Sequence, residues 1–282
     1  MIKARLFFAS LALLAAQPAL AEAPPRLATL EQQLSAIAAA NPGNIGIAAL
    51  DLNSGELVSI HGDTPFPMAS TVKVAIASNY MAQVEAGRRS LDDTIKGVPA
   101  RVLIGRMLIH SDNVATDMVL GNLGGPRFVQ SWLATKGVTG LRIDRTIAQL
   151  LAARRDLHDV RDSATPKAMV QMLRMLDRGS LLQPSSRSFI LSLMASCETG
   201  KNRMRALLPW GTPVEHKTGT LTGLADDVGF ITLPDGRRLA IAIFTRKGNN
   251  RPATIAQAAR TIYDGFLNSL KNPFGYSTYA TQ

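Results

Sequence analysis

Segments with the pattern of β-strands lie near both ends of this chain, and a long stretch with the pattern of helices separates them. A sheet is stable only when its strands pair and bury an apolar face, so the strands from the two ends must come together. The sequence therefore predicts one sheet built from both ends of the chain, with a helical domain inserted between its halves. The expected strands are residues 45–52, 57–61, 227–233 and 239–244, joined in pairs by the turns Asn53-Ser54-Gly55 and Pro234-Asp235-Gly236.

Helical patterns fill the sequence between these strands and also flank them. Residues 27–40 are expected to form an amphipathic helix, and a last helix carries one apolar face, formed by Ile255, Ala259, Ile262 and Phe266. In the middle of the chain, Thr165-Pro166 is typical of a helix start and Gly179 of its end. Another helix is expected to begin after Pro67 and to stop at Gly87.

The expected domain boundaries follow from this pattern. The chain of 282 residues is long enough for a two-part fold with a sizeable core. Residues 22–66 and 197–271 are assigned to the sheet domain, residues 67–196 to the helical domain, and residues 272–282 to a polar tail.

The first 21 residues have the pattern of a signal peptide. Lys3 and Arg5 form a basic start, residues 6–16 form an apolar run, and Ala19-Leu20-Ala21 is a small-x-small cleavage site. The apolar run is short for a bilayer span, and no other stretch reaches that length. We expect an exported protein, periplasmic or secreted, whose mature chain starts near Glu22 and has no membrane span. Retention of the segment as an anchor is the alternative.

Charge and cysteine content narrow the classes of partner. The formal net charge is +10, or +8 without Lys3 and Arg5, which suits an anionic ligand of the cell envelope or cell wall. No basic cluster is interleaved with aromatic residues, so we expect no nucleic-acid partner. The four histidines are scattered without metal-ligand spacing, so no metal or other cofactor is expected. Cys197 is the only cysteine, which excludes an intramolecular disulfide and indicates a small buried apolar side chain.

The stretch "MASTVKVAIA", residues 68–77, places a serine and a lysine in an otherwise apolar run. Ser70 and Lys73 are three residues apart, so they share one face near the start of the expected helix. A partly desolvated lysine loses its proton more easily and is then able to take a proton from the serine. The alternative is that Ser70 only caps the helix and that Lys73 extends to solvent. The S-x-x-K spacing alone favours this alternative, because it arises often by chance.

Two further triplets change that interpretation. Ser111-Asp112-Asn113 lies between two expected helices, where by itself it has the composition of a helix cap. Lys217-Thr218-Gly219 comes just before the expected C-terminal strands, where by itself it fits an exposed edge. In this order, S-x-x-K, S-D-N and K-T-G form the signature of penicillin-recognising serine enzymes.

With these motifs, nearly all of the mature sequence resembles the class A β-lactamase family. The resemblance implies an α/β (α+β) fold in which an antiparallel sheet is flanked by helices and carries an inserted all-helical domain. It implies that Ser70 is the acylated nucleophile, that Lys73 handles its proton, and that Ser111 passes a proton to the leaving nitrogen. It assigns contacts with the substrate to Asn113, Lys217, Thr218 and Gly219, and an oxyanion hole to the backbone N–H groups of Ser70 and Thr220. Acyl transfer needs a nucleophile, a base, an acid for the departing amine and paired donors for the oxyanion, and the resemblance assigns a group to each of these roles.

Three other residues match the family less directly. Arg203 lies fourteen residues before Lys217, where some relatives keep an arginine that supports binding of the substrate carboxylate. A plain surface arginine is an equal alternative. Arg145 and Asp162 match the ion pair that closes the omega loop of the family, so we expect them to hold that loop shut beneath the active site.

The omega loop also contains the main departure from the family. Relatives carry a glutamate two residues after the arginine and an asparagine four residues further on, and these hold the water that hydrolyses the acyl-enzyme. Counting forward from Arg145 in the run "DRTIAQLL" places Ile147 at the glutamate position and Leu151 at the asparagine position. Counting back from Asp162 places Gln149 at the glutamate position instead. None of the three side chains is a base. The connection from Lys73 to Ser111 is also shorter than in relatives and lacks an aromatic residue at the cleft.

Three functions therefore compete at this stage. The first is a β-lactam hydrolase with slow deacylation, for which Asp156, His158 and Asp159 are candidate substitute bases or ordinary solvated charges. The second is a penicillin-binding enzyme that acts on D-alanyl-D-alanine peptides as a carboxypeptidase. The third is a non-catalytic binding protein, which the intact Ser70 and Lys73 disfavour. The whole-chain resemblance favours the first, with a small β-lactam or D-Ala-D-Ala peptide as the partner and a monomer as the expected state.

Overall fold

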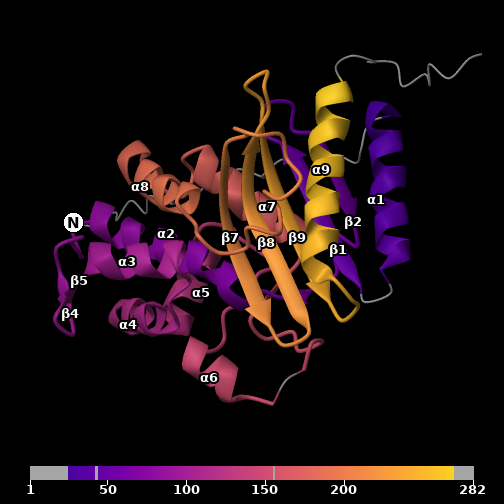
Figure 1. Cartoon of the computed structure of the whole chain (residues 1–282). Coiled ribbons are helices and arrows are strands. Elements are labelled where there is room, and N and C mark those ends of the chain that lie inside the picture. Colours follow the sequence, from indigo (N-terminus) through magenta and orange to yellow (C-terminus); the bar gives the residue numbers. More distant parts are fainter. Residues whose placement is uncertain (1–24, 42–43, 155, 270–282) are drawn as a thin grey trace, which may run out of the picture.

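A computed structural model describes residues 25–41, 44–154 and 156–269 (Figure 1). The predicted signal peptide and polar tail lie outside the described residues. A five-stranded antiparallel sheet has the order β2-β1-β9-β8-β7, so strands from both ends of the chain pair as predicted. Its strands are β1 (Ile45–Asp51), β2 (Leu57–Ile60), β7 (Val214–Leu221), β8 (Leu224–Thr232) and β9 (Arg238–Arg246).

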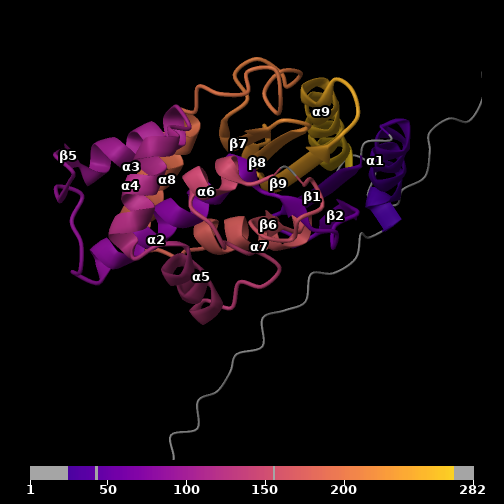
Figure 2. The same ribbon diagram turned by 90° about the horizontal axis from the view of Figure 1, so that it is seen from below.

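The sheet buries both faces, and side chains alternate between two apolar cores. On β9, Ile241 and Ile243 belong to one core, and Ala242 and Phe244 belong to the other. The first core lies under two helices from opposite ends of the chain, α1 (Ala28–Ala40, after the short 3₁₀ helix η1, Pro25–Leu27) and α9 (Arg251–Ser269). Figure 2 shows these helices on one side of the sheet and α7 (Pro166–Asp177) on the other.

The helical part lies beside the β7 edge of the sheet. At its centre is α2 (Lys73–Glu85), which is buried over most of its length. It continues the 3₁₀ helix η2 (Ala69–Val72), so the helix predicted after Pro67 has a tighter first turn. Around it lie α3 (Ala100–Ile109), α4 (Asn113–Leu123), α5 (Pro126–Thr135), α6 (Ile147–Ala152) and α8 (Pro184–Ala195), with the small hairpin β4–β5 (Thr94–Ile95, Val98–Pro99).

Helix α7 belongs by sequence to the helical middle but packs on the sheet, against β1 and β9. Its start is the predicted one, because the Thr165 side chain accepts a hydrogen bond from the backbone N–H of Ala168 and Pro166 occupies the first turn. Gly179 follows its end with a φ of 80°. The stretch with a helical pattern therefore supplies both the inserted helices and the cover of one sheet face.

The first of the three C-terminal strands was not predicted from sequence. The expectation that strands return at Asp227 is wrong, because β7 precedes β8 and β8 begins at Leu224. The triplet Lys217-Thr218-Gly219 therefore lies inside a strand and is buried, not in an exposed edge before the strands. The usual alternation of apolar and polar residues is missing here because buried polar side chains line the edge that faces the helical part.

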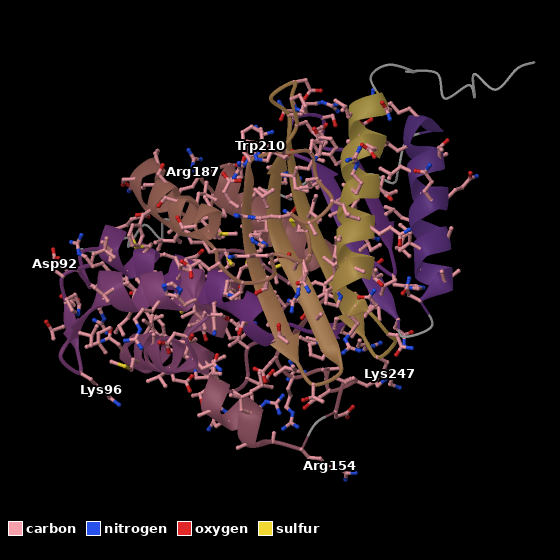
Figure 3. The ribbon with its side chains drawn as sticks, in the orientation of Figure 1. Asp92, Lys96, Arg154, Arg187, Trp210 and Lys247 are labelled. Atoms are coloured by element: carbon pink, nitrogen blue, oxygen red, sulfur yellow. The ribbon has the colours of Figure 1, made fainter. Side chains whose placement is uncertain are left out.

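The excess of cationic side chains lies on several faces of the molecule. Lys96, Arg154 and Lys247 are exposed, and Figure 3 shows them at the hairpin β4–β5, in the loop after α6 and at the end of the sheet. Trp210 is also fully exposed, near the start of β7. None of the helices in the described part of the chain combines the length and the apolar character needed to cross a membrane.

Candidate active site

Ser70 lies in η2, which contacts β7 and β8 of the sheet and leads into α2 of the helical part. The residue before it, Ala69, has a φ of 45°, a left-handed conformation that is uncommon for residues other than glycine and is concentrated at functional sites. The Ser70 side chain is partly exposed, and its hydroxyl makes no hydrogen bond to another described residue. This serine is therefore accessible for reaction and is not a helix cap.

Lys73 is the first residue of α2 and is fully buried, so it does not extend to solvent. Its Nζ donates to Ser111 O at 2.7 Å, to Asn113 Oδ1 at 2.8 Å and to Ser111 Oγ at 3.2 Å. Burial, and then the positive charge of Lys217, lower the pKa of Lys73 to about 7. At neutral pH a substantial fraction of this amine is unprotonated, which is the form that acts as a base.

Ser111 joins the two lysines of the motifs. Its Oγ accepts from Lys73 Nζ and also from Lys217 Nζ, at 3.0 Å. Both hydroxyl lone pairs are thus directed at amines, which leaves the hydroxyl hydrogen free to point into the cleft. Ser111 has a φ of 60°, so this connecting position also adopts a left-handed conformation.

Asp112 holds the turn that carries Ser111. Its Oδ1 accepts from Ala115 N at 2.9 Å, which caps α4 as predicted, and its Oδ2 accepts from Arg106 Nε at 2.9 Å. The backbone hydrogen bond from Ala115, with further help from Arg106, lowers the pKa of Asp112. Asp112 therefore fixes the turn, while its neighbours Ser111 and Asn113 contact Lys73.

Lys217 is buried and points from β7 toward Ser111. Besides Ser111 Oγ, its Nζ donates to Thr218 O at 2.9 Å. Burial lowers the pKa of Lys217 to about 8, and the charge of Arg203 acts in the same direction. The group remains a cation at neutral pH, suited to bind an anionic carboxylate.

Strand β7 passes directly against η2, and Gly219 makes this close approach possible. A Cβ atom at this position would lie 2.7 Å from Met68 O and 3.2 Å from Ala69 Cβ. Any side chain would push the strand away from the serine. The glycine of the K-T-G motif therefore sets the distance between the two walls of the site.

Arg203 is buried behind β7, so the alternative of a surface arginine is wrong. Its Nη1 donates to Gly219 O at 2.8 Å and to Asp226 O at 2.9 Å, and its Nη2 donates to Thr220 Oγ1 at 2.7 Å. The guanidinium thus holds the C-terminal half of the strand in place and adds positive charge next to Lys217.

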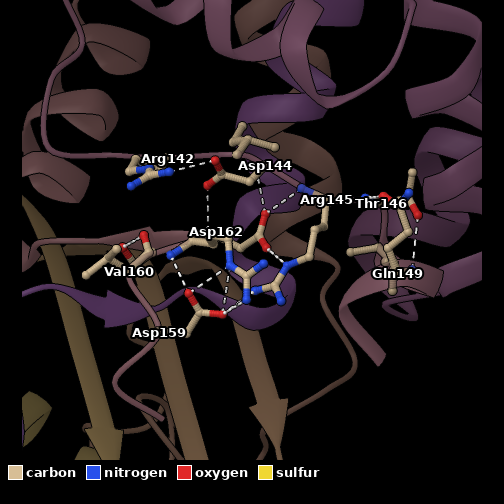
Figure 4. A network of polar contacts seen from close by, with 12 residues as sticks. Arg142, Asp144, Arg145, Thr146, Gln149, Asp159, Val160 and Asp162 are labelled. Carbon is tan, nitrogen blue, oxygen red and sulfur yellow. Dashed lines mark hydrogen bonds and ion pairs between the residues drawn. The ribbon is translucent and has the colours of Figure 1, made fainter. Parts of the chain in front are cut away.

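The omega loop is closed by the predicted ion pair, with Arg145 Nε 2.5 Å from Asp162 Oδ2 (Figure 4). Asp162 Oδ1 also accepts from the backbone N–H groups of Asp144 and Arg145. The loop is attached to the nucleophile segment as well, because Met68 N donates to Asp162 O at 2.9 Å. Next to this bond, the short strands β3 (Phe66–Pro67) and β6 (Ser163–Ala164) pair.

Ile147, the first of the three omega-loop positions considered in the sequence analysis, is the first residue of α6 and is buried in the apolar core. Leu151 is about half exposed. Gln149 is not directed at the serine, because it forms a capping box with Thr146. None of these three side chains is a base.

The sequence analysis missed Asp117, which anchors α6. Its Oδ1 accepts from Ile147 N at 2.7 Å and its Oδ2 from Ala148 N at 2.8 Å, at the positive end of the helix. Asp117 also contributes to the electrostatic environment of Lys73. Its partner Ile147 N lies 30 residues further along the chain, so no local sequence signal pointed to this contact.

The three loop residues proposed as substitute bases lie in different surroundings. Asp159 is bound by Arg161 and Arg145, and mainly the Arg161 hydrogen bonds lower the pKa of Asp159 to about 2. Asp156 and His158 are exposed, and Asp156 Oδ1 accepts from His158 N at 2.8 Å. A carboxylate as acidic as Asp159 is a weak proton acceptor. Among the described residues, no three histidine, cysteine or acidic side chains are grouped so as to hold a metal ion.

The profile of the β-lactamase enzyme family matches residues 29–266 of the chain. The chain is 28% identical to the extended-spectrum β-lactamase PER-1 of Pseudomonas aeruginosa, over 86% of its own length and 88% of that protein. It is 30% identical to the carbapenem-hydrolyzing β-lactamase KPC of Klebsiella oxytoca, over 79% of its own length and 84% of that protein.

Solved structures show the same similarity. The reconstructed last common ancestor of Gram-negative class A β-lactamases superposes with a TM-score of 0.80 at 31% identity, covering 84% of this chain and 99% of that one. A β-lactamase from Chitinophaga pinensis gives a TM-score of 0.78 at 28% identity, with 86% and 99% covered. The family match over residues 29–266 includes the whole sheet, the inserted helices and the positions of all three motifs. The chain therefore belongs to the β-lactamase enzyme family and is a hydrolase of the class A β-lactamase type.

Proposed function

We propose that the protein opens β-lactams through an acyl-enzyme on Ser70 and releases the product slowly. The observation that carries this proposal is the position of Ser111 Oγ, which contacts Lys73 Nζ at 3.2 Å and Lys217 Nζ at 3.0 Å. This contact links a base, a proton relay and a carboxylate-binding cation around one reactive serine. The substrate is a small β-lactam whose carboxylate meets Lys217 and Thr218.

The first chemical step is attack of Ser70 Oγ on the lactam carbonyl carbon. Neutral Lys73 takes the serine proton, because its pKa of about 7 leaves the amine partly unprotonated at neutral pH. The negative charge that develops on the carbonyl oxygen is placed near the backbone N–H groups of Ser70 and Thr220. As the C–N bond breaks, Ser111 donates its proton to the lactam nitrogen and is reprotonated by Lys73.

The second step, hydrolysis of the ester, is the slow one. Ile147 and Leu151 offer alkyl groups where relatives place a base and its partner, and Gln149 is held in the capping box. A positioned general base contributes about 10²–10⁴-fold to such a step. The acyl-enzyme is therefore expected to outlive that of an ordinary relative by a factor of this order, so that a burst precedes slow turnover.

Intact-mass spectrometry after mixing with a penicillin tests both steps in one time course. The expected result is a rapid mass increase equal to the penicillin that decays much more slowly than it forms, with no increase in Ser70→Ala. Labelling of Ser70→Ala would overturn the assignment of the nucleophile. Fast turnover of wild-type enzyme without an accumulating adduct would overturn slow deacylation, and Asp156→Asn and His158→Gln would then identify the base.

A carboxypeptidase acting on D-alanyl-D-alanine peptides is the second candidate, and the apolar Ile147 favours it because that reaction does not need the omega-loop glutamate. Incubation with a diacetyl-lysyl-D-alanyl-D-alanine peptide separates the two. Release of free D-alanine faster than release of the penicillin adduct would make the peptide the better substrate. If no D-alanine is released, the carboxypeptidase is excluded and the β-lactamase remains as the only one of the two candidates.

We further propose that the protein acts outside the cytoplasm as a monomer. This rests on the basic and apolar pattern of residues 1–21 and on the sequence relatives reported above. Cell fractionation of the full chain is expected to place a processed form in the periplasm or the medium, and size-exclusion chromatography with light scattering to give the mass of one chain. An unprocessed cytoplasmic form would contradict export, and the mass of two chains would contradict the monomer.

A further inference from the structure

The single cysteine lies in a buried cluster behind β7 that the proposed reaction does not use. Cys197 follows α8, His216 belongs to β7 and Asp227 to β8, and these side chains are 5%, 0% and 0% exposed. His216 Nδ1 donates to Asp227 Oδ1 at 2.7 Å, and Asp227 Oδ2 accepts from Met204 N at 3.1 Å. The carboxylate thus fixes which nitrogen of the ring carries its proton, and Nε2 is directed away from it.

His216 Nε2 is a buried polar atom without a hydrogen bond of ordinary geometry to any described residue. The side chain of Cys197, which follows α8 where that helix packs beside β7, interacts with the His216 side chain. An imidazole oriented by a carboxylate and placed next to a thiol is the arrangement that activates cysteine as a nucleophile. The expectation that Cys197 is only a small apolar side chain therefore misses its partner.

The electrostatics of the cluster agree with this geometry. Burial by itself raises the pKa of the Cys197 thiol, but interaction with the His216 imidazolium and with the Thr199 hydroxyl outweighs burial and lowers this pKa to about 7. Burial lowers the pKa of His216, and the Asp227 carboxylate reverses this and raises it to about 9. Lys217 is the other charged group that acts on the thiol, and its charge also favours the thiolate.

We propose that Cys197 is a modification site: a thiolate, paired with the His216 imidazolium and oriented through Asp227, that reacts with small peroxides and small thiol reagents. In the reaction with hydrogen peroxide, the sulfur attacks one peroxide oxygen, so an S–O bond forms as the O–O bond breaks. Cysteine is oxidised by two electrons to the sulfenic acid. The leaving hydroxide takes the proton from His216 Nε2 and departs as water.

Access to the sulfur comes from the loop between α8 and β7. Cys197 is 5% exposed and lies between the exposed residues Ser196 and Glu198, so we expect small reagents to approach the sulfur through this loop. Glu198 N donates to Ile109 O at 3.1 Å, which ties this loop to the end of α3.

The cluster is connected to the carboxylate-binding strand through two hydroxyl groups. Thr199 Oγ1 lies 3.3 Å from Cys197 Sγ and 2.6 Å from Thr218 Oγ1. Each hydroxyl has one hydrogen, so a thiolate that accepts from Thr199 leaves Thr199 to accept from Thr218. Thr199 Oγ1 lies in contact with the sulfur, so an added oxygen or methylthio group competes for this space and breaks the chain. Modification therefore reaches the wall that, on the proposed function, binds the substrate carboxylate.

The rate of labelling by methyl methanethiosulfonate as a function of pH tests the site without any β-lactam. The thiolate displaces methanesulfinate and gains a methylthio group, which intact mass reports, and Cys197→Ser gives the unlabelled background. We expect a rate that rises with a midpoint near pH 7. The midpoint should move toward that of an ordinary thiol, about 8.5, in His216→Asn and in the milder Asp227→Asn. Hydrogen peroxide should add one oxygen that dithiothreitol removes to the wild-type chain, and no such oxygen to Cys197→Ser.

Labelling only after unfolding in guanidinium, or a midpoint at or above about 8.5 in the folded wild-type chain, would overturn the site. An unchanged midpoint in a folded Asp227→Asn chain would overturn the role of the carboxylate. The link to Thr218 has its own readout: the fully labelled wild-type chain should acylate Ser70 more slowly, and reagent-treated Cys197→Ser should not. Equal acylation rates would overturn the link and leave the labelled site in place.

Discussion

At the scale of single residues, two buried lysines face one serine hydroxyl. Lys73 and Lys217 both contact Ser111 Oγ, and burial lowers the pKa of each amine. Lys73 tends to lose its proton, since its pKa is lowered to about 7, whereas Lys217, with a pKa lowered to about 8, keeps its proton over a wider range. Two groups of one chemical type therefore divide the roles of base and cation because their surroundings differ.

This division predicts a bell-shaped dependence of acylation on pH. The base form of Lys73 accumulates as pH rises through about 7, so the second-order rate of acylation by a penicillin should rise there. The cationic form of Lys217 is lost as pH rises through about 8, so the rate should then fall. Mass spectrometry of quenched samples gives this rate directly.

An ester analogue of the same penicillin is the matched control. It has no carboxylate for Lys217 to bind, so the fall above about pH 8 should disappear while the rise near 7 remains. With the ester, the charge-assisted hydrogen bond of about 1.5–3 kcal/mol is also absent, which should slow acylation at neutral pH. A rate that keeps rising to pH 10 with the acid would contradict the lowered pKa of Lys73.

At the scale of elements, the site depends on how closely β7 packs against η2. Gly219 allows the contact because its place beside Met68 O has no room for a side chain. Arg203 fixes the strand from behind through Gly219 O and Thr220 Oγ1. The distance between Ser70 and β7, the strand proposed to bind the substrate carboxylate, is thus set by backbone approach and not by the motif side chains alone.

Gly219→Ala should therefore impair catalysis while the chain still folds. The new Cβ would lie 2.7 Å from Met68 O and 2.8 Å from Asp226 Oδ2, so β7 must shift outward. A shift of this kind should slow acylation by about 10²-fold, the loss that a misplacement of about 1 Å causes. The rate of adduct formation measures it.

Gly121→Ala is the control for this substitution. Gly121 lies on an exposed face of α4 with open space around its Cβ position, so alanine there should add about 0.5–1 kcal/mol of stability and leave acylation unchanged. Acylation at the wild-type rate in Gly219→Ala would show that the strand has freedom to move without cost.

At the scale of the whole molecule, the omega loop connects the sheet side of the fold to the helical part. Asp162 binds Arg145 within the loop and also accepts from Met68 N, two residues before the nucleophile. Asp117 on α4 holds the other side of the loop through the start of α6. The nucleophile segment is therefore held between the loop on one side and β7 on the other.

Removing the Asp162 carboxylate should destabilise the entire fold. Asp162→Ala leaves the largely buried Arg145 guanidinium and two backbone N–H groups without their main acceptor, which should cost about 3–5 kcal/mol in the free energy of unfolding. Urea unfolding monitored by circular dichroism measures this loss. Asp92→Ala, which breaks the exposed pair with Arg101, should cost at most about 1 kcal/mol. Equal losses in the two variants would contradict a structural role of the omega-loop pair.

The sequence by itself determined the features that rest on local pattern. Turn residues and apolar spacing predicted β1, β2, β9, α1, α7 and α9, and the three motifs predicted the family and the arrangement of an antiparallel sheet with inserted helices. These succeed because a helix start such as Thr165-Pro166, or a motif of fixed spacing, depends only on neighbouring residues. The Arg145–Asp162 pair, 17 residues apart, was predicted from the resemblance to the family and not from local pattern.

Tertiary structure alone decided the features that depend on what lies across a gap in sequence. Strand β7 was missed because its polar residues are buried against distant elements, so its alternation is absent. Three other features depend on contacts between segments 11 to 30 residues apart. They are the burial of Arg203, the hydrogen bond from Ile147 N to Asp117, and the cluster of Cys197 with His216 and Asp227. Local sequence does not report such contacts, because the free energy of a buried polar group is set by the partners that the fold brings to it.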